Sequence, residues 1–166
     1  LSTLVRSGGP LAESQVIELA YQMADILKCL HGQEPPVIHR DFTPDNLILA
    51  NDGVLKLIDF NVAEQRSTTS TTATVVGKHA YISPEQFRGK PVPQSDIYSM
   101  GATMFFLLCG HDPKPISVAH PRSLMPAVSE GIDNLVACCT AISTENRGAD
   151  AAKLAQLLDD LKGALI

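Results

Sequence analysis

The chain has 166 residues, 45% of them hydrophobic, and a formal net charge of −5 at pH 7. This length and hydrophobic content predict one globular domain with a single core. Because the net charge is negative and no apolar run approaches the roughly 20 residues that cross a bilayer, we expect no nucleic-acid partner and no direct membrane contact from this segment.

The four cysteines indicate a reducing environment. They form neither a C-x-x-C pair nor the histidine spacing of a zinc site, and each lies in a helical apolar pattern. We therefore expect reduced, mostly buried thiols in a cytoplasmic protein. The four are Cys29, Cys109, Cys138 and Cys139.

The first part of the chain predicts one long helix followed by short strands. Over residues 13–31, apolar side chains recur with the 3.6-residue period of an amphipathic helix, which Gly32 closes. Residues 37–60 alternate apolar and turn residues. They predict short strands joined by tight loops, with a hairpin turn at 51–53.

The remainder predicts further helices. Residues 65–76 are rich in Ser and Thr and predict a loop, whereas residues 95–109 are apolar on nearly every face, as in a helix buried at the centre of a domain. Residues 110–131 show no sustained period, so we expect a shortened loop, followed by helices over 132–142 and 149–161. The predicted fold class is mainly α with a small β-hairpin region.

Two carboxylates and one carboxamide stand at neighbouring strand ends in the stretch VIHRDFTPDNLILANDGVLKLIDF. Asp41 is followed five residues later by Asn46, and Asp59 comes directly before Phe60. An Asp that accepts a hydroxyl proton, with an Asn and a second Asp that hold Mg²⁺, is what phosphoryl transfer from ATP requires. In order and spacing these residues resemble the eukaryotic-type protein kinase family.

The resemblance continues beyond these residues. Ser83-Pro84-Glu85 is similar to the Ala-Pro-Glu motif that closes the family's activation segment. Asp96 resembles the Asp that opens the long central helix, and Arg147 resembles the Arg that pairs with the Glu of Ala-Pro-Glu. The chain is therefore similar to the C-terminal lobe of a kinase.

The family's N-terminal lobe is expected to be absent from residues 1–166. These residues contain no G-x-G-x-x-G loop and no Val-Ala-Ile-Lys-like strand. We expect that lobe as a partner, besides a protein substrate, and expect the lone chain to be inactive. The resemblance implies the end of the interlobe hinge at 1–10, catalytic and metal-binding loops at 37–60 and an activation segment at 59–85.

The resemblance implies a role for each residue around the predicted base. Asp41 would be the catalytic base, and Asn46 and Asp59 would hold Mg²⁺ and the phosphates of ATP. His39 is expected to be structural. Arg40 is expected to be buried beside the base, where it would need an anionic partner.

Regulation is expected from the Ser/Thr-rich loop. A phosphate on Thr74, or as second choice on Thr72, would supply the anionic partner of Arg40 and order the loop.

Three further residues would hold the site together without taking part in the chemistry. Glu85 and Arg147 would form a buried ion pair that clamps the substrate-binding segment, and Asp96 would accept hydrogen bonds from the backbone of the catalytic loop.

Three residues depart from the family pattern. Asn61 replaces the Gly after Asp-Phe, Thr43 replaces a Lys that contacts the γ-phosphate, and Lys78 replaces a Thr of the substrate loop. Because the family's Lys and Thr touch each other beside the base, we hypothesise a reciprocal swap in which Lys78 reaches the γ-phosphate. The alternative is independent drift, with Lys78 in solvent and a reduced activity.

Pro44 and the segment GKHAYISPEQ resemble serine/threonine kinases, in a bacterial style, rather than tyrosine kinases. The leading function is a Ser/Thr protein kinase that uses ATP and Mg²⁺, soluble or as the cytosolic part of a membrane receptor kinase. Two alternatives stay open. One is a pseudokinase or scaffold that binds partners, and the other is a small-molecule phosphotransferase of the aminoglycoside or choline type.

Overall fold

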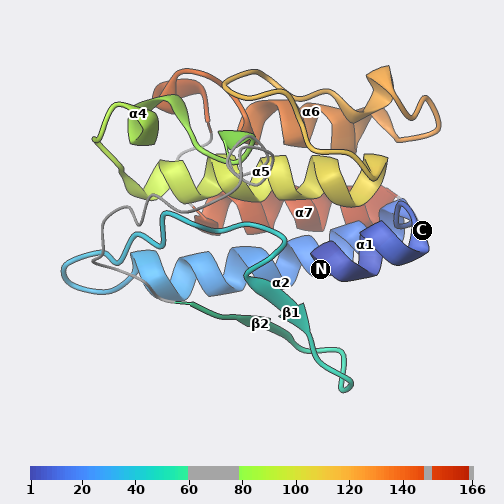
Figure 1. Ribbon diagram of the computed structural model, residues 1–166, viewed down its shortest axis with the longest axis horizontal. Coiled ribbons are helices and arrows are strands. Elements are labelled where there is room, and N and C mark those ends of the chain that lie inside the picture. The colour runs from blue at the N-terminus through green and yellow to red at the C-terminus, as the bar shows by residue number, and fades with distance from the viewer. Residues whose placement is uncertain (60–78, 148–150, 165–166) are drawn as a thin grey trace.

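In the computed structural model, residues 1–59, 79–147 and 151–164 are described, except for the side chains of 151, 152 and 160–164, and most of these residues are helical (Figure 1). The α-helices are α1 (Ser2–Gly8), α2 (Glu13–His31), α4 (Pro84–Phe87), α5 (Pro93–Cys109), α6 (Glu130–Cys139) and α7 (Ala151–Ala164). Two 3₁₀ turns, η1 (Pro121–Ser123) and η2 (Thr144–Asn146), flank α6, and strands β1 (Leu47–Leu49) and β2 (Leu55–Leu57) form a hairpin.

Helix α5 lies at the centre of the fold. Figure 1 shows it between α6 and α2, and α7 packs along α2. Every residue from Ser95 to Cys109 is buried, which explains why this stretch is apolar on nearly all faces. The predicted class, mainly α with one small hairpin, is confirmed.

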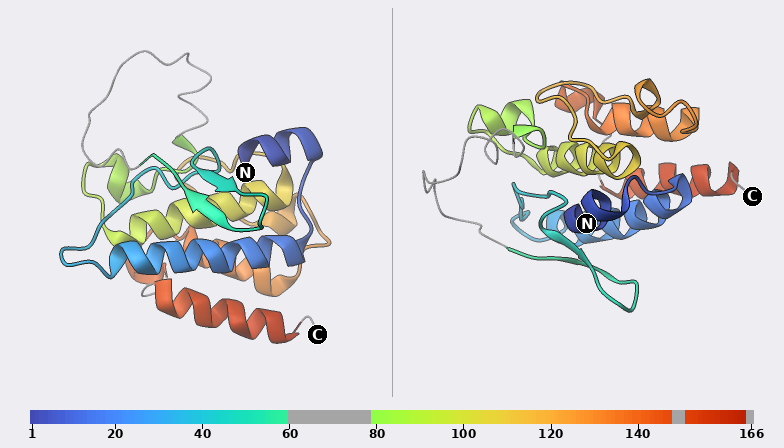
Figure 2. Two further views of the ribbon diagram at one scale, coloured as in Figure 1. Left: turned by 90° about the horizontal axis from the view of Figure 1, so that it is seen from below. Right: turned by 45° about the vertical axis from the view of Figure 1, so that its right-hand side comes forward.

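The hairpin is attached to α2. Leu47 pairs with Leu57 in an antiparallel register, and Leu47 and Leu55 are buried. Gln22 of α2 donates from Nε2 to the Gly53 carbonyl (3.1 Å) and accepts from Leu55 N (2.7 Å). Figure 2 shows the two strands on the side of the fold formed by α1 and α2, away from α6. The hairpin turn predicted at 51–53 is present, with Gly53 at φ 80°.

Strands occupy less of residues 37–60 than predicted. Residues 37–46 contain no strand, because their backbone groups bond to side chains and turns rather than to a neighbouring strand.

The helix predicted over 132–142 instead spans Glu130–Cys139, since Ser129 caps its first turn by accepting from Ile132 N.

Two other boundaries differ from the prediction. Helix α5 begins two residues early, at Pro93, because proline is well suited to a first helical position. Helix α7 spans Ala151–Ala164 rather than 149–161. Helix α1 was not predicted, and the Ser/Thr-rich residues 65–76 lie outside the described part of the chain.

The cysteines are free thiols but not all buried. Cys109 and Cys139 are buried, Cys138 is half-buried and Cys29 is exposed, so the prediction of mostly buried thiols is correct for two of them. Burial raises the pKa of Cys109 to about 11, which keeps that thiol protonated and unreactive. Within the described residues, no helix is long and apolar enough to cross a membrane.

Gly101 sets the distance between α5 and α6. A Cβ there would lie 2.5 Å from Cys139 Cβ and 3.1 Å from Thr140 Cγ2. Gly101→Ala should force the helices apart and lower the free energy of unfolding by about 1–3 kcal/mol, as measured by urea denaturation. Gly8→Ala is the matched control, because nothing lies within 4 Å of its added Cβ. Equal stability of the two variants would contradict this packing argument.

Candidate active site

Asp41 and Asn46 lie together in the loop between α2 and β1. The Asn46 side chain donates from Nδ2 to both the Asp41 carbonyl (2.8 Å) and Asp41 Oδ2 (2.9 Å). Asn46 is buried and Asp41 is half-buried. The loop is tightened by bonds from Thr43 N to the Asp41 carbonyl and from Asn46 N to the Thr43 carbonyl, both 3.0 Å. One carboxylate oxygen of Asp41 is therefore held in a set direction.

Asp59 follows β2, whose end is bonded to the loop of Asn46. Ile58 N, just past β2, donates to the Asn46 carbonyl over 2.9 Å. Asp59 follows directly, is exposed, and has φ 60°, a left-handed conformation that Asp tolerates better than most residues. The exposed Asp59 thus lies one residue from a backbone bond to Asn46.

The residues present fit a magnesium–phosphate site. Mg²⁺ prefers oxygen ligands and is usually bound by one or two protein oxygens together with phosphates and water. The Asp59 carboxylate supplies such oxygens, and the Asn46 amide presents Oδ1 because its Nδ2 is bonded to Asp41. No cluster of three or more His, Cys, Asp or Glu suited to a metal occurs in the described ranges.

Asp96 holds the loop that carries Asp41 from within α5. Its side chain is fully buried, and its carboxylate accepts from His39 N and Arg40 N, each over 2.8 Å. His31 Nε2, at the end of α2, lies 3.0 Å from the same carboxylate. A buried carboxylate with several donors is well satisfied, so it can hold these backbone amides rigidly. The predicted contact between Asp96 and the loop backbone is present.

Two hydroxyls on the same helix face were missed from the sequence. Ser99 Oγ donates to the Tyr81 carbonyl (2.7 Å), and Thr103 Oγ donates to the Phe42 carbonyl (3.4 Å). Ser95, Ser99 and Thr103 follow one another at intervals of four residues, and Asp96 precedes Ser99 by three, in a helix that is otherwise mostly apolar. Such a spacing places side chains on one helix face. This polar stripe was the signal that could have identified them.

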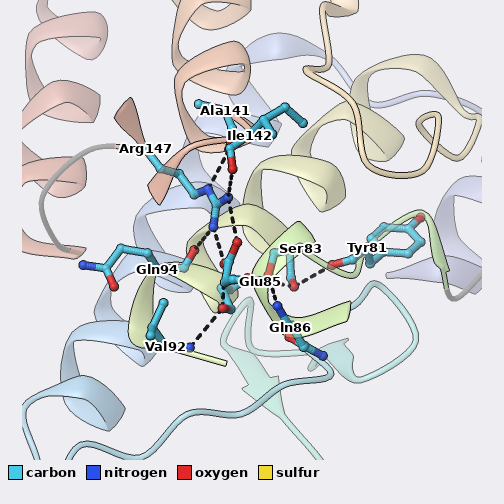
Figure 3. Close-up of polar contacts among 11 residues, drawn as sticks. Tyr81, Ser83, Glu85, Gln86, Val92, Gln94, Ala141, Ile142 and Arg147 are labelled. Carbon is cyan, nitrogen blue, oxygen red and sulfur yellow. Dashed lines mark hydrogen bonds and ion pairs between the residues drawn. The ribbon is translucent and has the colours of Figure 1, made fainter. Parts of the chain in front are cut away.

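Glu85 and Arg147 form the predicted ion pair (Figure 3). Arg147 Nη1 donates to Glu85 Oε1 (2.5 Å) and Nη2 donates to Oε2 (3.1 Å). The Arg147 side chain is fully buried, and its other donors reach the carbonyls of Gln94, Ala141 and Ile142. Ser95 Oγ also donates to Glu85 Oε1 over 2.6 Å. The pair therefore joins α4 to α5 and to the segment after α6.

The environment of Glu85 favours its charged form. Burial by itself would raise its pKa, but hydrogen bonds from Arg147, Ser95 and Ser83 outweigh that effect and lower the pKa to about 2. The carboxylate thus stays charged far into the acidic range.

The remaining predicted residues have mixed outcomes. His39 is buried, and its Nδ1 accepts from Asp41 N (3.3 Å). Thr43 is also buried.

Arg40 is exposed, so the prediction of a buried guanidinium is wrong. The backbone N–H of Arg40 donates to the buried Asp96, but the Arg40 side chain is exposed. The motif specifies the backbone contact and does not specify what packs over the side chain. Four residues lie outside the described part of the chain: Asn61, Thr72, Thr74 and Lys78.

A cavity of about 400 Å³ opens beside the loop. It is bounded by the start of α1, by Pro44 and Asp45, and by the exposed apolar residues Ile48 and Leu49 of β1. The cavity is thus lined by Pro44 and Asp45 of the loop and has an apolar floor at Ile48 and Leu49.

Replacement of the Glu85 carboxylate tests the ion pair. Glu85→Gln leaves the Arg147 charge buried without its partner and should lower the free energy of unfolding by about 3–5 kcal/mol at neutral pH. Because the folded-state pKa is lowered, the contribution of Glu85 is present above its usual pKa of 4.5 and is lost as pH falls toward about 2. Denaturant unfolding across that range should show the two proteins converging.

The matched control is Glu145→Gln, which alters an exposed carboxyl near Arg147. It should leave stability and its pH dependence unchanged. A gap between wild type and Glu85→Gln that stays constant down to about pH 2 would contradict the assignment.

Comparisons with known proteins agree with this geometry. Residues 1–160 match the family model of the protein kinase domain. The serine/threonine-protein kinase PknL of Mycobacterium tuberculosis is 34% identical over 167 residues, covering 91% of this chain and 41% of PknL. The probable serine/threonine-protein kinase PknB of Lactococcus lactis is 32% identical over 170 residues, covering 93% of this chain and 27% of PknB. This chain therefore spans less than half of these relatives.

Solved structures share the fold at lower identity. The kinase domain of M. tuberculosis PknI superposes with a TM-score of 0.71 at 21% identity, covering 92% of this chain and 56% of that chain. Rad53, solved in complex with AMP-PNP, superposes with a TM-score of 0.70 at 24% identity, covering 93% of this chain and 42% of that chain. By its family match and its relatives, the chain belongs to the protein kinase family, among the eukaryotic-like serine/threonine kinases of bacteria.

Proposed function

We propose that this chain is the C-terminal lobe of a Ser/Thr protein kinase, which transfers the γ-phosphate of ATP to hydroxyls of a protein substrate. The observation that carries the proposal is the bonded pair of Asp41 and Asn46, with Asp59 at the adjoining strand end. The family membership supports the same reaction.

Asp41 is the proposed base. It orients the substrate hydroxyl and takes its proton, a role typically worth about 10²–10⁴-fold in rate. Its bond from Asn46 and the bonds from His39 N and Arg40 N to Asp96 keep the loop in one arrangement, so the carboxylate meets the hydroxyl without reorganisation.

ATP and Mg²⁺ are the proposed co-substrate and cofactor. Asn46 and Asp59 would hold the ion, which when bound neutralises charge on the phosphates. The apolar floor at Ile48 and Leu49 would receive the adenine, since the same cavity is lined by Pro44 and Asp45 of the loop that carries Asn46.

The proposed active unit includes a small lobe as partner. Residues 1–166 contain no Gly-rich loop to cover the phosphates, so by themselves they should transfer little phosphate. The free thiols support a cytoplasmic location, in a soluble kinase or in the cytosolic part of a membrane receptor kinase.

Regulation is proposed to act through Arg40. An exposed guanidinium beside the base is accessible to a phosphorylated loop residue. We propose Thr74 as that residue and Thr72 as the second choice.

The second candidate function is a pseudokinase that binds partners. The observation that favours it is the burial of Thr43, which replaces the phosphate-contacting Lys of the family with a short side chain that is only 4% exposed. A small-molecule phosphotransferase is disfavoured by the Glu85–Arg147 pair, which stabilises the segment that binds protein substrates in kinases.

Autophosphorylation distinguishes kinase from pseudokinase. The full-length protein incubated with Mg-ATP should incorporate phosphate at Thr74 or Thr72, identified by mass spectrometry. Asp41→Asn should lower incorporation by about 10²-fold or more. Asp52→Asn is the control, because this exposed carboxyl caps the hairpin turn and the amide keeps the acceptor. A folded protein that incorporates no phosphate would favour the pseudokinase.

A double-mutant cycle tests the exchange between Thr43 and Lys78. Thr43→Lys and Lys78→Thr should each lower kcat, and the double variant should recover activity, because each residue then regains the partner it requires. A coupling free energy of about 0.5–3 kcal/mol is expected. Strictly additive losses would support independent drift instead.

A further inference from the structure

Gln86, the third residue of α4, reaches the catalytic loop. Its Nε2 donates a 2.6 Å hydrogen bond to the Arg40 carbonyl, across 46 residues of sequence. Arg40 directly precedes Asp41, so this bond acts on the peptide group that joins the two. Gln86 was not among the residues predicted for the site.

The peptide group between Arg40 and Asp41 is bound at both ends. Its carbonyl accepts from Gln86, and its amide, Asp41 N, donates to His39 Nδ1 at 3.3 Å. Because a peptide group is planar, binding its carbonyl and its N–H restricts rotation about the bonds on either side, including φ of Asp41. The direction in which the Asp41 side chain leaves the loop therefore depends on Gln86.

Arg40 also needs this support for its own conformation. Its φ of 67° is one that residues other than glycine rarely adopt and that persists only where the surroundings impose it. Asp96 Oδ1 accepts from its N–H over 2.8 Å, and Gln86 donates to its carbonyl. The first contact comes from α5 and the second from α4, so two separate elements impose the conformation.

Stability does not explain a glutamine at this position. Gln86 Oε1 is buried and has no hydrogen-bond partner among the described residues. A buried acceptor without a donor offsets what the Nε2 bond contributes. An apolar side chain of similar length would remove both effects and leave the fold about equally stable.

We propose that Gln86 is a positioning residue for the base: it orients the peptide group between Arg40 and Asp41 and thereby the Asp41 carboxylate. The inference rests on the proposed function, since orientation affects rate only if Asp41 is the base. Glu85, the preceding residue, is bonded to buried Arg147, so Gln86 acts from a rigid support.

Two substitutions in the full-length protein separate positioning from packing. Gln86→Met keeps the length and removes the donor, whereas Gln86→Glu keeps the shape but presents only acceptors to the Arg40 carbonyl. We expect kcat to fall about 10-fold or more for Gln86→Met and further for Gln86→Glu. KM for Mg-ATP and peptide should change less than about 2-fold, and Tm of Gln86→Met should be unchanged. A milder effect of Gln86→Glu, the closer isostere, or a loss that follows Tm, would overturn the proposal.

Amide hydrogen exchange gives a readout that needs no kinase activity. In Gln86→Met the amides of Arg40 and Asp41 should exchange about 10-fold faster than in wild type. Gln156→Met, in an exposed glutamine of α7, should leave both unchanged. Unchanged exchange in Gln86→Met would overturn the inference even in an active kinase. Faster exchange in a protein that transfers no phosphate would confirm that Gln86 holds the loop but would contradict the proposed kinase function.

Discussion

The arrangement depends on a row of buried polar side chains on one face of α5. Each contacts a different segment: Ser95 the Glu85 carboxylate, Asp96 the amides of His39 and Arg40, Ser99 the Tyr81 carbonyl and Thr103 the Phe42 carbonyl. In an interior that excludes water, these bonds are strong and an unpaired polar group is costly. The loops therefore have one arrangement in which all four side chains are satisfied, and it brings Asp41 and the segment before α4 together.

Helix α4 connects two regions that are distant in sequence, although it has only four residues. Glu85 is bonded to Arg147, and Gln86 is bonded to the Arg40 carbonyl. Because the Arg147 charge is buried and its donors are occupied by one carboxylate and three carbonyls, the anchor is rigid. A displacement of α4 would then be transmitted to the peptide group before Asp41.

Of the three described residues other than glycine that have positive φ, two lie where the chemistry is proposed, and the third, Ile116, lies in the loop after α5. Arg40 and Asp59, at either side of the site, have positive φ without being glycine. Such conformations cost about 1–3 kcal/mol each and persist where the surroundings impose them. Around Arg40 those surroundings are Asp96 and Gln86, and Asp59 follows the bond from Ile58 N to Asn46. The rest of the fold therefore supplies the stability that keeps these two backbones in place.

The sequence by itself determined the helical class, the central position of α5 and the hairpin turn, and it singled out Asp41, Asn46, Asp59, Asp96, Glu85 and Arg147 as candidate site residues. Periodicity and motif spacing are local properties of the chain, so they can be seen without a structure. The exposure of Arg40, the hydroxyl contacts of Ser99 and Thr103, and the bond from Gln86 were decided only by tertiary structure. The polar stripe on α5 marks Ser99 and Thr103, but no local pattern shows which carbonyls they bind. The bonded partners of Gln86, Ser99 and Thr103 lie 18 to 61 residues away in the sequence, so these contacts form only when distant segments pack together.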